Sequence, residues 1–311
     1  LGGTPATGLV STGLGGGARL AWTPGERPVR FGPFLGFSAV WMRVSIPGDD
    51  ARLSADELQV RVPLGAALRA RLEDAEARWP EAFAGASRNN AHYNLTVLDE
   101  IVHNATLLDA VEDLIGPDIL NYGTVLFIKE PKDPGFVSWH QDARYMGLEP
   151  HVGVTAWLAL SPATSESGCM RMIPGSHVSG IKEHHDTFGE QNLLTRGQQV
   201  EDVDGQDFVE TPLRPGQLSF HSQRIVHSSL PNVSPDRRIG FAIQSYIPPH
   251  VVQTKLRTSA QLVRGHASSD NFDLAQRPRC DMDSEGLALR DKVNADWSRI
   301  LYEGAEQRRD L

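Results

Sequence analysis

The chain has 311 residues, of which 40% are hydrophobic and 22% charged, and a formal net charge of -9. This is the composition of a globular protein that buries a core, and it excludes collagen-like, disordered and membrane-spanning classes. The acidic balance, with no run of basic residues, argues against nucleic acid or an anionic membrane surface as a partner.

The two cysteines, Cys169 and Cys280, lie far apart and form no CxxC pair. They can build neither a disulfide framework nor a cysteine zinc site, so we expect a cytoplasmic protein. The length fits a single domain, which we place over residues 31–311, in a monomer or a homodimer. Residues 1–30 are rich in glycine, proline and threonine and show no helical or strand period, which predicts a flexible leader.

Three helices are predicted outside the middle of the chain. Residues 63–79 place apolar side chains near helical spacing, with charged side chains on the other face. A second helix begins after Asn104, which can cap its first turn, and ends at Gly116 and Pro117. The third is predicted over about residues 287–303, where an apolar residue recurs every four positions.

Between the second and third helices the period changes to that of strands, which predicts a β-rich core over about residues 120–250. The strand-like segments are 124–128, 152–160, 169–173, 217–220 and 238–247. A long polar segment, about residues 176–215, interrupts them without a clear period. Because loops of this length in compact domains usually have a function, we expect a lid-like insertion that orders when substrate binds.

A short motif at residues 138–142, SWHQD, carries candidate metal ligands. His140 and Asp142 are two positions apart, so on a strand both side chains leave the same face and can reach one metal ion. The later segment FHSQRIVHSS offers a third ligand in either His221 or His227. Two histidines and one carboxylate on one face of a metal form the triad typical of non-haem Fe(II) oxygenases. A His-x-Asp motif alone matches by chance, so other residues have to support it.

Arg238, at the start of the last predicted core strand, gives that support. A buried guanidinium needs an anion, and one beside a metal site suits the distal carboxylate of a metal-bound 2-oxo acid. The neighbouring Arg237 is expected at the surface, because alternation along a strand sends the two side chains to opposite faces.

Two segments of the sequence resemble a known family, the phytanoyl-CoA dioxygenase family of Fe(II)/2-oxoglutarate oxygenases, in its bacterial branch. The similar segments are WHQDARYMGLEPHVGVTAWLALSPATSESGCMRMIPGSH and PGQLSFHSQRIVHSSLPNVSPDRRIGFAIQSYIP, and the resemblance covers roughly residues 55–280. It implies a mainly β fold with flanking helices, built as a double-stranded β-helix barrel of the jelly-roll or cupin-like type. The site is then expected inside the barrel.

The resemblance also implies roles for individual residues. The implied iron ligands are His140, Asp142 and His227. His221 is then left as a core residue or a neighbour of the site. The implied contacts of 2-oxoglutarate are Arg238, on its distal carboxylate, together with Ser229, Trp157 and Thr155. The candidates for substrate contact are Gln141, Lys129, Arg144 and Arg171.

The predicted activity is the hydroxylation of an aliphatic C–H bond of a small molecule, with Fe(II), 2-oxoglutarate and O₂, yielding succinate and CO₂. Other oxidative outcomes, such as desaturation or cyclisation of a natural-product scaffold, stay open because they depend on how the substrate is placed. A second hypothesis is a barrel that binds Zn²⁺ or a small ligand without redox chemistry. A purely structural barrel ranks last, because it would bury a ligand triad and an arginine without function.

Overall fold

The computed structural model describes residues 60–61, 66–203 and 205–309, and the predicted leader, residues 1–30, lies outside this range. The helices are α1 (Ala66–Arg78), α2 (Thr96–Val102), α3 (Ala105–Ile115), the short α4 (Ala143–Met146) and α5 (Ser284–Leu301). Short 3-10 helices at Pro80–Phe83, Gly85–Arg88 and Ala91–Tyr93 connect α1 to α2. None of the helices in the described ranges is long and apolar enough to span a membrane.

The predicted cap and stop of the second helix are both present at the ends of α3. Asn104 Oδ1 accepts a hydrogen bond from Leu107 N at 3.2 Å, which satisfies one of the backbone N–H groups that the first turn leaves free. Gly116 ends the helix with a φ of 94°, a conformation that glycine adopts without strain. The helix therefore begins and ends where the sequence predicts.

Two helical boundaries differ from the sequence prediction. Helix α5 begins at Ser284 rather than near residue 287, because the Asp283 side chain accepts a hydrogen bond from Glu285 N at 3.4 Å and caps an earlier turn. Helix α2 was not predicted, because its 7 residues are too few for the helical period to stand out.

The larger sheet forms one wall of the barrel, with strand order β1-β11-β6-β13-β2-β15-β16 and with β3 also paired to β13. Its strands are β1 (Val60–Arg61), β2 (Ile119–Asn121), β3 (Thr124–Lys129), β6 (Val154–Ala159), β11 (Gln217–Ser222), β13 (Arg238–Ile247), β15 (Ser259–Arg264) and β16 (Asp273–Leu274). Strand β13 is central, because it pairs antiparallel with β3, β6 and β2.

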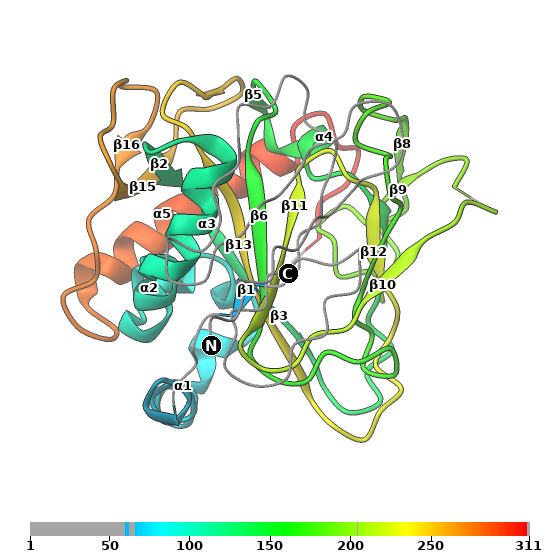
Figure 1. The fold of residues 1–311 in the computed structure, drawn as a ribbon, viewed down its shortest axis with the longest axis horizontal. Coiled ribbons are helices and arrows are strands. Elements are labelled where there is room, and N and C mark those ends of the chain that lie inside the picture. The colour runs from blue at the N-terminus through cyan, green and yellow to red at the C-terminus, as the bar shows by residue number, and fades with distance from the viewer. Residues whose placement is uncertain (1–59, 62–65, 204, 310–311) are drawn as a thin grey trace, which may run out of the picture.

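The smaller sheet forms the opposite wall, with strand order β10-β7-β12-β4. Its strands are β4 (Val137–His140), β7 (Met170–Met172), β10 (Val209–Thr211) and β12 (His227–Ser229). Two further strand pairs complete the described strands, β5 (Leu148–Glu149) with β14 (Val252–Gln253), and β8 (His184–Asp186) with β9 (Gln198–Val200). The two walls make the jelly-roll barrel that the resemblance implied, with helices on its flank (Figure 1).

Alternation along β6 separates a structural face from a functional face. Ala156 and Leu158 belong to the same hydrophobic core as Leu107 of α3, whereas Thr155 and Trp157 line a pocket on the other side of the sheet. Helices α2 and α3 accordingly cover one face of the large sheet, and the small sheet lies on the other side (Figure 1). The period of two in the sequence thus decides which side chains reach the barrel interior.

The polar segment 176–215 is more regular than the sequence predicted. It contains β8, β9 and β10, and β10 pairs with β7 as a strand of the small sheet. Arg196 in this segment also donates hydrogen bonds to Leu301 O at 3.2 Å and Glu303 O at 3.1 Å, beside the end of α5. The predicted closure of this segment over substrate, like the single domain over residues 31–311, stays a prediction.

Candidate metal and co-substrate site

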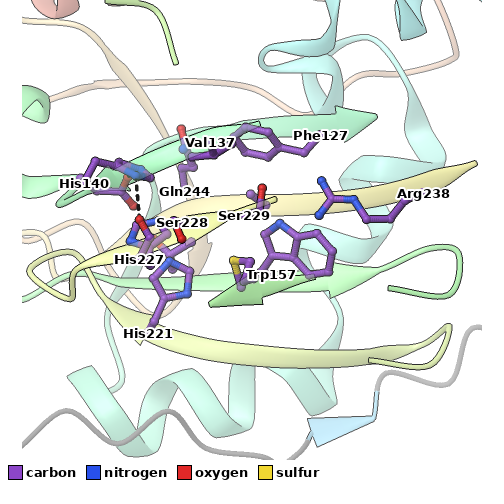
Figure 2. Close-up of a pocket in the computed structure, with 14 residues that line it drawn as sticks. Phe127, Val137, His140, Trp157, His221, His227, Ser228, Ser229, Arg238 and Gln244 are labelled. Carbon is purple, nitrogen blue, oxygen red and sulfur yellow. Dashed lines mark hydrogen bonds and ion pairs between the residues drawn. The ribbon is translucent and has the colours of Figure 1, made fainter. Parts of the chain in front are cut away.

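A pocket lies between the two sheets, with one polar cluster at each end. Its lining residues are Phe127, Val137, His140, Asp142, Thr155, Trp157, Met170, His221, His227, Ser228, Ser229, Arg238, Ala242 and Gln244. Figure 2 shows the histidines together at one end, Arg238 with Trp157 at the other, and Ser229 between them. The pocket therefore has a histidine end and a cation end, which are described in turn.

The histidine end brings together the three predicted metal ligands. His140 closes β4 and His227 opens β12, and the two residues are direct partners in the antiparallel pairing of these strands. One donor atom from each of His140, Asp142 and His227 lies within 4.8 Å of the other two. All three residues are buried, whereas His221 stays outside this donor cluster.

Backbone hydrogen bonds orient both imidazoles for metal binding. His140 Nδ1 lies 2.9 Å from Ser138 O and 3.1 Å from His227 O, and His227 Nδ1 lies 3.1 Å from Ile225 O. A carbonyl oxygen only accepts, so each Nδ1 carries the proton and each Nε2 keeps a free lone pair. This is the arrangement by which proteins fix a metal-binding histidine. The donor set therefore fits an Fe(II) ion.

The ionisation states at this end also suit a metal. Burial opposes the charge of Asp142, but the neighbouring His140, His227 and His221 outweigh it and hold the pKa of the carboxyl well below its usual range. Burial lowers the pKa of His227 well below its ordinary value, and it lowers the pKa of His221 to about 4. The cluster thus offers a carboxylate and neutral imidazole, which are the forms that bind metals.

The cation end is formed where β3 and β13 run side by side. Lys129 and Arg238 are direct partners in the pairing of these strands, and both side chains are buried. Arg238 Nη1 donates to Gly168 O at 2.9 Å, while its Nε has no partner within the described ranges. Lys129 Nζ donates to Ser229 Oγ at 2.8 Å and also to Leu230 O.

No carboxylate in the described part of the chain lies within ion-pair distance of either cation. Burial, followed by the charge of Arg238, lowers the pKa of Lys129 to about 6. Burial also lowers the pKa of Arg238 to about 10. Two buried cationic groups that face each other without an anion are unfavourable unless a ligand supplies the negative charge.

Trp157 forms a wall of the cation end. The Arg238 guanidinium carbon lies 5.2 Å from the centre of its ring. Gly240 allows this packing, because a Cβ there would lie only 1.9 Å from Trp157 Cζ2. Arg237 points away from the pocket, as predicted, and pairs with Glu76 at 2.5 Å and Glu130 at 2.9 Å.

The predicted co-substrate residues all line this pocket, whereas the four substrate candidates do not. Gln141 Nε2 donates to Gly180 O at 2.9 Å and to Arg224 O at 2.5 Å, which ties the ligand strand to the 176–215 segment. Arg171 Cζ lies 4.9 Å from the ring of Trp139 and 5.0 Å from that of Phe208. Arg144 is exposed, and Lys129 belongs to the cation end.

Several pocket residues were missed in the sequence. They include Phe127, Val137, Met170 and Gln244. His221, predicted as a core residue or a neighbour of the site, lines the pocket. The signal that could have found one of the missed residues is alternation. Gln244 lies an even number of positions after Arg238 on β13, so the two side chains leave the same face of the strand.

The similarity of this chain to known proteins agrees with this geometry. Residues 53–240 match the phytanoyl-CoA dioxygenase family. The chain is 29% identical over 124 residues to a phytanoyl-CoA dioxygenase domain-containing protein 1 homolog of Dictyostelium discoideum, covering 39% of this chain and 44% of the relative. It is 26% identical over 162 residues to a probable alpha-ketoglutarate-dependent hypophosphite dioxygenase of Stutzerimonas stutzeri, covering 49% and 55%. The chain thus spans about half the length of the curated relatives it matches.

Solved structures show the same barrel. The non-heme monooxygenase ThoJ superposes with a TM-score of 0.67 at 32% identity, over 78% of this chain and 92% of that chain. CytC3 with Fe(II) and alpha-ketoglutarate superposes with a TM-score of 0.53 at 19% identity, over 71% and 89%, and supports the fold alone.

The barrel, the three metal donors and the buried arginine at the cation end together define the class of Fe(II)/2-oxoglutarate-dependent oxygenases. Fe(II) and 2-oxoglutarate are the cofactors of that class. Within it, the chain belongs to the phytanoyl-CoA dioxygenase family, as its sequence resemblance implied. The bacterial branch of this family stays a prediction.

Proposed function

We propose that the protein hydroxylates an aliphatic C–H bond of a small molecule. One atom of O₂ enters the substrate as the hydroxyl oxygen, and the other enters succinate as 2-oxoglutarate loses CO₂. The observation that carries this proposal is the two-ended pocket, with three metal donors at one end and, at the other, the buried Arg238, which has no carboxylate partner among the described residues.

In this proposal His140, Asp142 and His227 hold Fe(II), which supplies the activation of O₂. The protein's own contribution is to fix the donors before the metal arrives. Carbonyl oxygens of Ser138 and Ile225 hold the two imidazole rings in place. Three protein donors leave part of the coordination sphere open for the co-substrate and O₂.

The cation end binds the distal carboxylate of 2-oxoglutarate. Arg238 Nε has no partner among the described residues, and Ser229, which lines the same pocket, accepts a hydrogen bond from Lys129 Nζ. Charged donors to a carboxylate form strong hydrogen bonds in a buried site, and the flat Trp157 ring closes one side. The dicarboxylate therefore spans the pocket from the metal donors to Arg238.

The test of the reaction is succinate formation by the iron-loaded protein in the presence of O₂, screened across amino acids, phosphonates, acyl-CoAs and natural-product scaffolds. Hydroxylation predicts a product heavier by one oxygen atom, formed in step with succinate. A product lighter by two hydrogen atoms would instead indicate desaturation or cyclisation, and its NMR spectrum would show whether a double bond or a new ring has formed.

The non-redox alternative has its own outcome in the same screen. A protein that binds Zn²⁺ tightly but gives no succinate with any substrate, and does not bind 2-oxoglutarate after anaerobic iron loading, would contradict the proposed reaction. The Ala variant of His227 serves as the background control, because removal of one donor leaves the barrel but not the triad.

A further inference from the structure

A row of polar side chains crosses the large sheet opposite the metal donors. The row consists of His221 on β11, Thr155 on β6 and Gln244 on β13, and all three residues line the pocket. His221 and Thr155 are direct partners in the antiparallel pairing of their strands. Phe220 and Ala156 alternate with these residues on the opposite, core face of the sheet, so His221 and Thr155 belong to the face that lines the pocket.

Two atoms of this row have no hydrogen-bond partner in the part of the chain that the structure describes. They are His221 Nδ1 and Thr155 Oγ1, and the two residues are only 3% and 1% exposed. A buried polar atom without a partner is costly, and it is uncommon in native structures unless a ligand or water completes it. Both atoms belong to residues that face the same cavity, which points to a shared ligand.

The position of the row fixes which part of a ligand it meets. The His221 ring centre lies 4.8 Å from that of the metal donor His227, and Figure 2 shows His221 projecting from its strand toward His227. Thr155 shares a face of β6 with Trp157, which packs on Arg238 at the far end. Thr155 and His221 therefore mark the metal end of the pocket, and Trp157 marks the cation end.

We propose that His221 and Thr155 bind the carboxylate of 2-oxoglutarate that adjoins its keto group. This inference rests on the proposed function. A 2-oxo acid chelates a metal through the keto oxygen and one oxygen of the adjoining carboxylate, so the second oxygen of that carboxylate needs hydrogen-bond donors. An imidazole N–H and a hydroxyl are suitable donors, and the row supplies both from the wall opposite the metal ligands.

This assignment divides the co-substrate between two sets of residues. Arg238 recognises the distal carboxylate, whereas His221 and Thr155 recognise the carboxylate next to the metal. A ligand that lacks the distal carboxylate should then lose its dependence on Arg238 and keep its dependence on the row. The ligand 2-oxovalerate meets this requirement, because a methyl group replaces the distal carboxylate and the chelating end is unchanged.

The experiment measures the binding of 2-oxoglutarate and 2-oxovalerate without turnover. The protein is loaded with Fe(II) under anaerobic conditions, and chelation is followed by the visible charge-transfer absorption of the Fe(II)–2-oxo acid complex. Calorimetry on the Ni²⁺-loaded protein gives the same dissociation constants independently. Thr155→Val removes the hydroxyl at constant shape, and His221→Leu removes the imidazole donor.

We expect each variant to raise the Kd of both ligands by about tenfold, as for the loss of one hydrogen bond to a charged group. Thr155→Ser and His221→Asn restore a donor, so they should recover most of the affinity. The matched control is Ser219→Ala. Ser219 Oγ is also buried without a partner, on the same strand, but this residue does not line the pocket, so both Kd values should stay within about twofold.

Three outcomes would overturn the inference. The first is an unchanged Kd in Thr155→Val and His221→Leu, and the second is a loss confined to 2-oxoglutarate, which would place the row at the distal carboxylate. The third is an equal loss in Ser219→Ala, which would show a general effect on the sheet. If Thr155→Val or His221→Leu does not fold, full affinity in a folded His221→Phe variant would overturn the inference equally well.

Failure of the proposed function looks different in the same titrations. In that case the unmodified protein gives no charge-transfer absorption with 2-oxoglutarate, and Arg238→Ala changes nothing. If the unmodified protein binds 2-oxoglutarate and Arg238→Ala weakens it, the proposed function stands whether or not the row contributes.

Discussion

The two ends of the pocket are built on different plans. At the metal end, both imidazole Nδ1 atoms are already bonded to backbone carbonyls, and the donor atoms converge before any ion is present. At the cation end, Arg238 keeps an unpartnered Nε and the pKa of Lys129 is lowered to about 6, by burial and then by Arg238. The first arrangement suits a metal ion that remains bound between turnovers. The second suits a co-substrate anion that binds and dissociates in each turnover.

The largest effect should follow from breaking the metal end. His227→Ala removes one of the three converging donors, so the two that remain hold a metal ion with an incomplete set of ligands. We expect it to abolish both 2-oxoglutarate turnover and stoichiometric iron binding, as measured by metal analysis after anaerobic loading and desalting. The ion should also raise the melting temperature of the unmodified protein but not that of the variant, because a ligand that binds only the folded state stabilises it.

His221 provides the comparison for that experiment. It lies beside His227 and lines the same pocket, yet it stays outside the donor cluster. His221→Leu should therefore retain iron. If His227→Ala kept iron and turnover while His221→Leu lost both, the assignment of the third ligand would be wrong.

The next largest effect should come from Arg238→Ala at the cation end. Removal of one partner of a buried charged hydrogen bond costs roughly 2–5 kcal/mol, so the KM for 2-oxoglutarate should rise by about two orders of magnitude while iron affinity stays unchanged. Arg237→Ala is the matched control, since its side chain pairs at the surface with Glu76 and Glu130. An unchanged KM in Arg238→Ala would count decisively against this end as the co-substrate site.

The two ends also differ in how well the sequence predicted them. Local patterns predicted His140 and Asp142, which lie two positions apart in one motif, and left His221 or His227 as the third ligand. The family resemblance implied His227, which the structure pairs with His140. Arg238 was predicted from its place at the start of a strand. Lys129 was predicted as a substrate contact, and its place beside Arg238 depends on the register between β3 and β13, which no local pattern records.

The same limit applies to residues whose partners are distant in the chain. Gln141 was a substrate candidate because it stands inside the metal motif, but its side chain bonds Gly180 O and Arg224 O. The alternation on β6 was visible in the sequence, whereas the unpartnered atoms of Thr155 and His221 become visible only when two strands are paired. Strand composition therefore predicted the barrel and its metal motif, and side-chain contacts between strands required the structure.

The smallest expected effect is on the pH dependence of 2-oxoglutarate binding, through the titration of Lys129. Burial, followed by Arg238, lowers the pKa of this amine to about 6, so in the empty pocket it is mostly neutral at pH 7. A bound carboxylate favours the charged amine and raises its pKa, so binding takes up a proton in the interval between the two values. By linkage, the affinity for 2-oxoglutarate should fall as the pH rises above about 6, by up to about tenfold per pH unit.

Lys129→Met tests this coupling, because it keeps the length of the side chain and removes the titrating group. The slope of log Kd against pH should flatten in the variant, and calorimetry in buffers of different ionisation enthalpy should show the proton uptake only in the unmodified protein. Cys169, one of the titratable groups near Lys129, does not ionise in this range, since burial raises its pKa to about 11. An equal pH slope in both proteins would show that Lys129 keeps one protonation state, and the cation end would then owe its affinity to Arg238 alone.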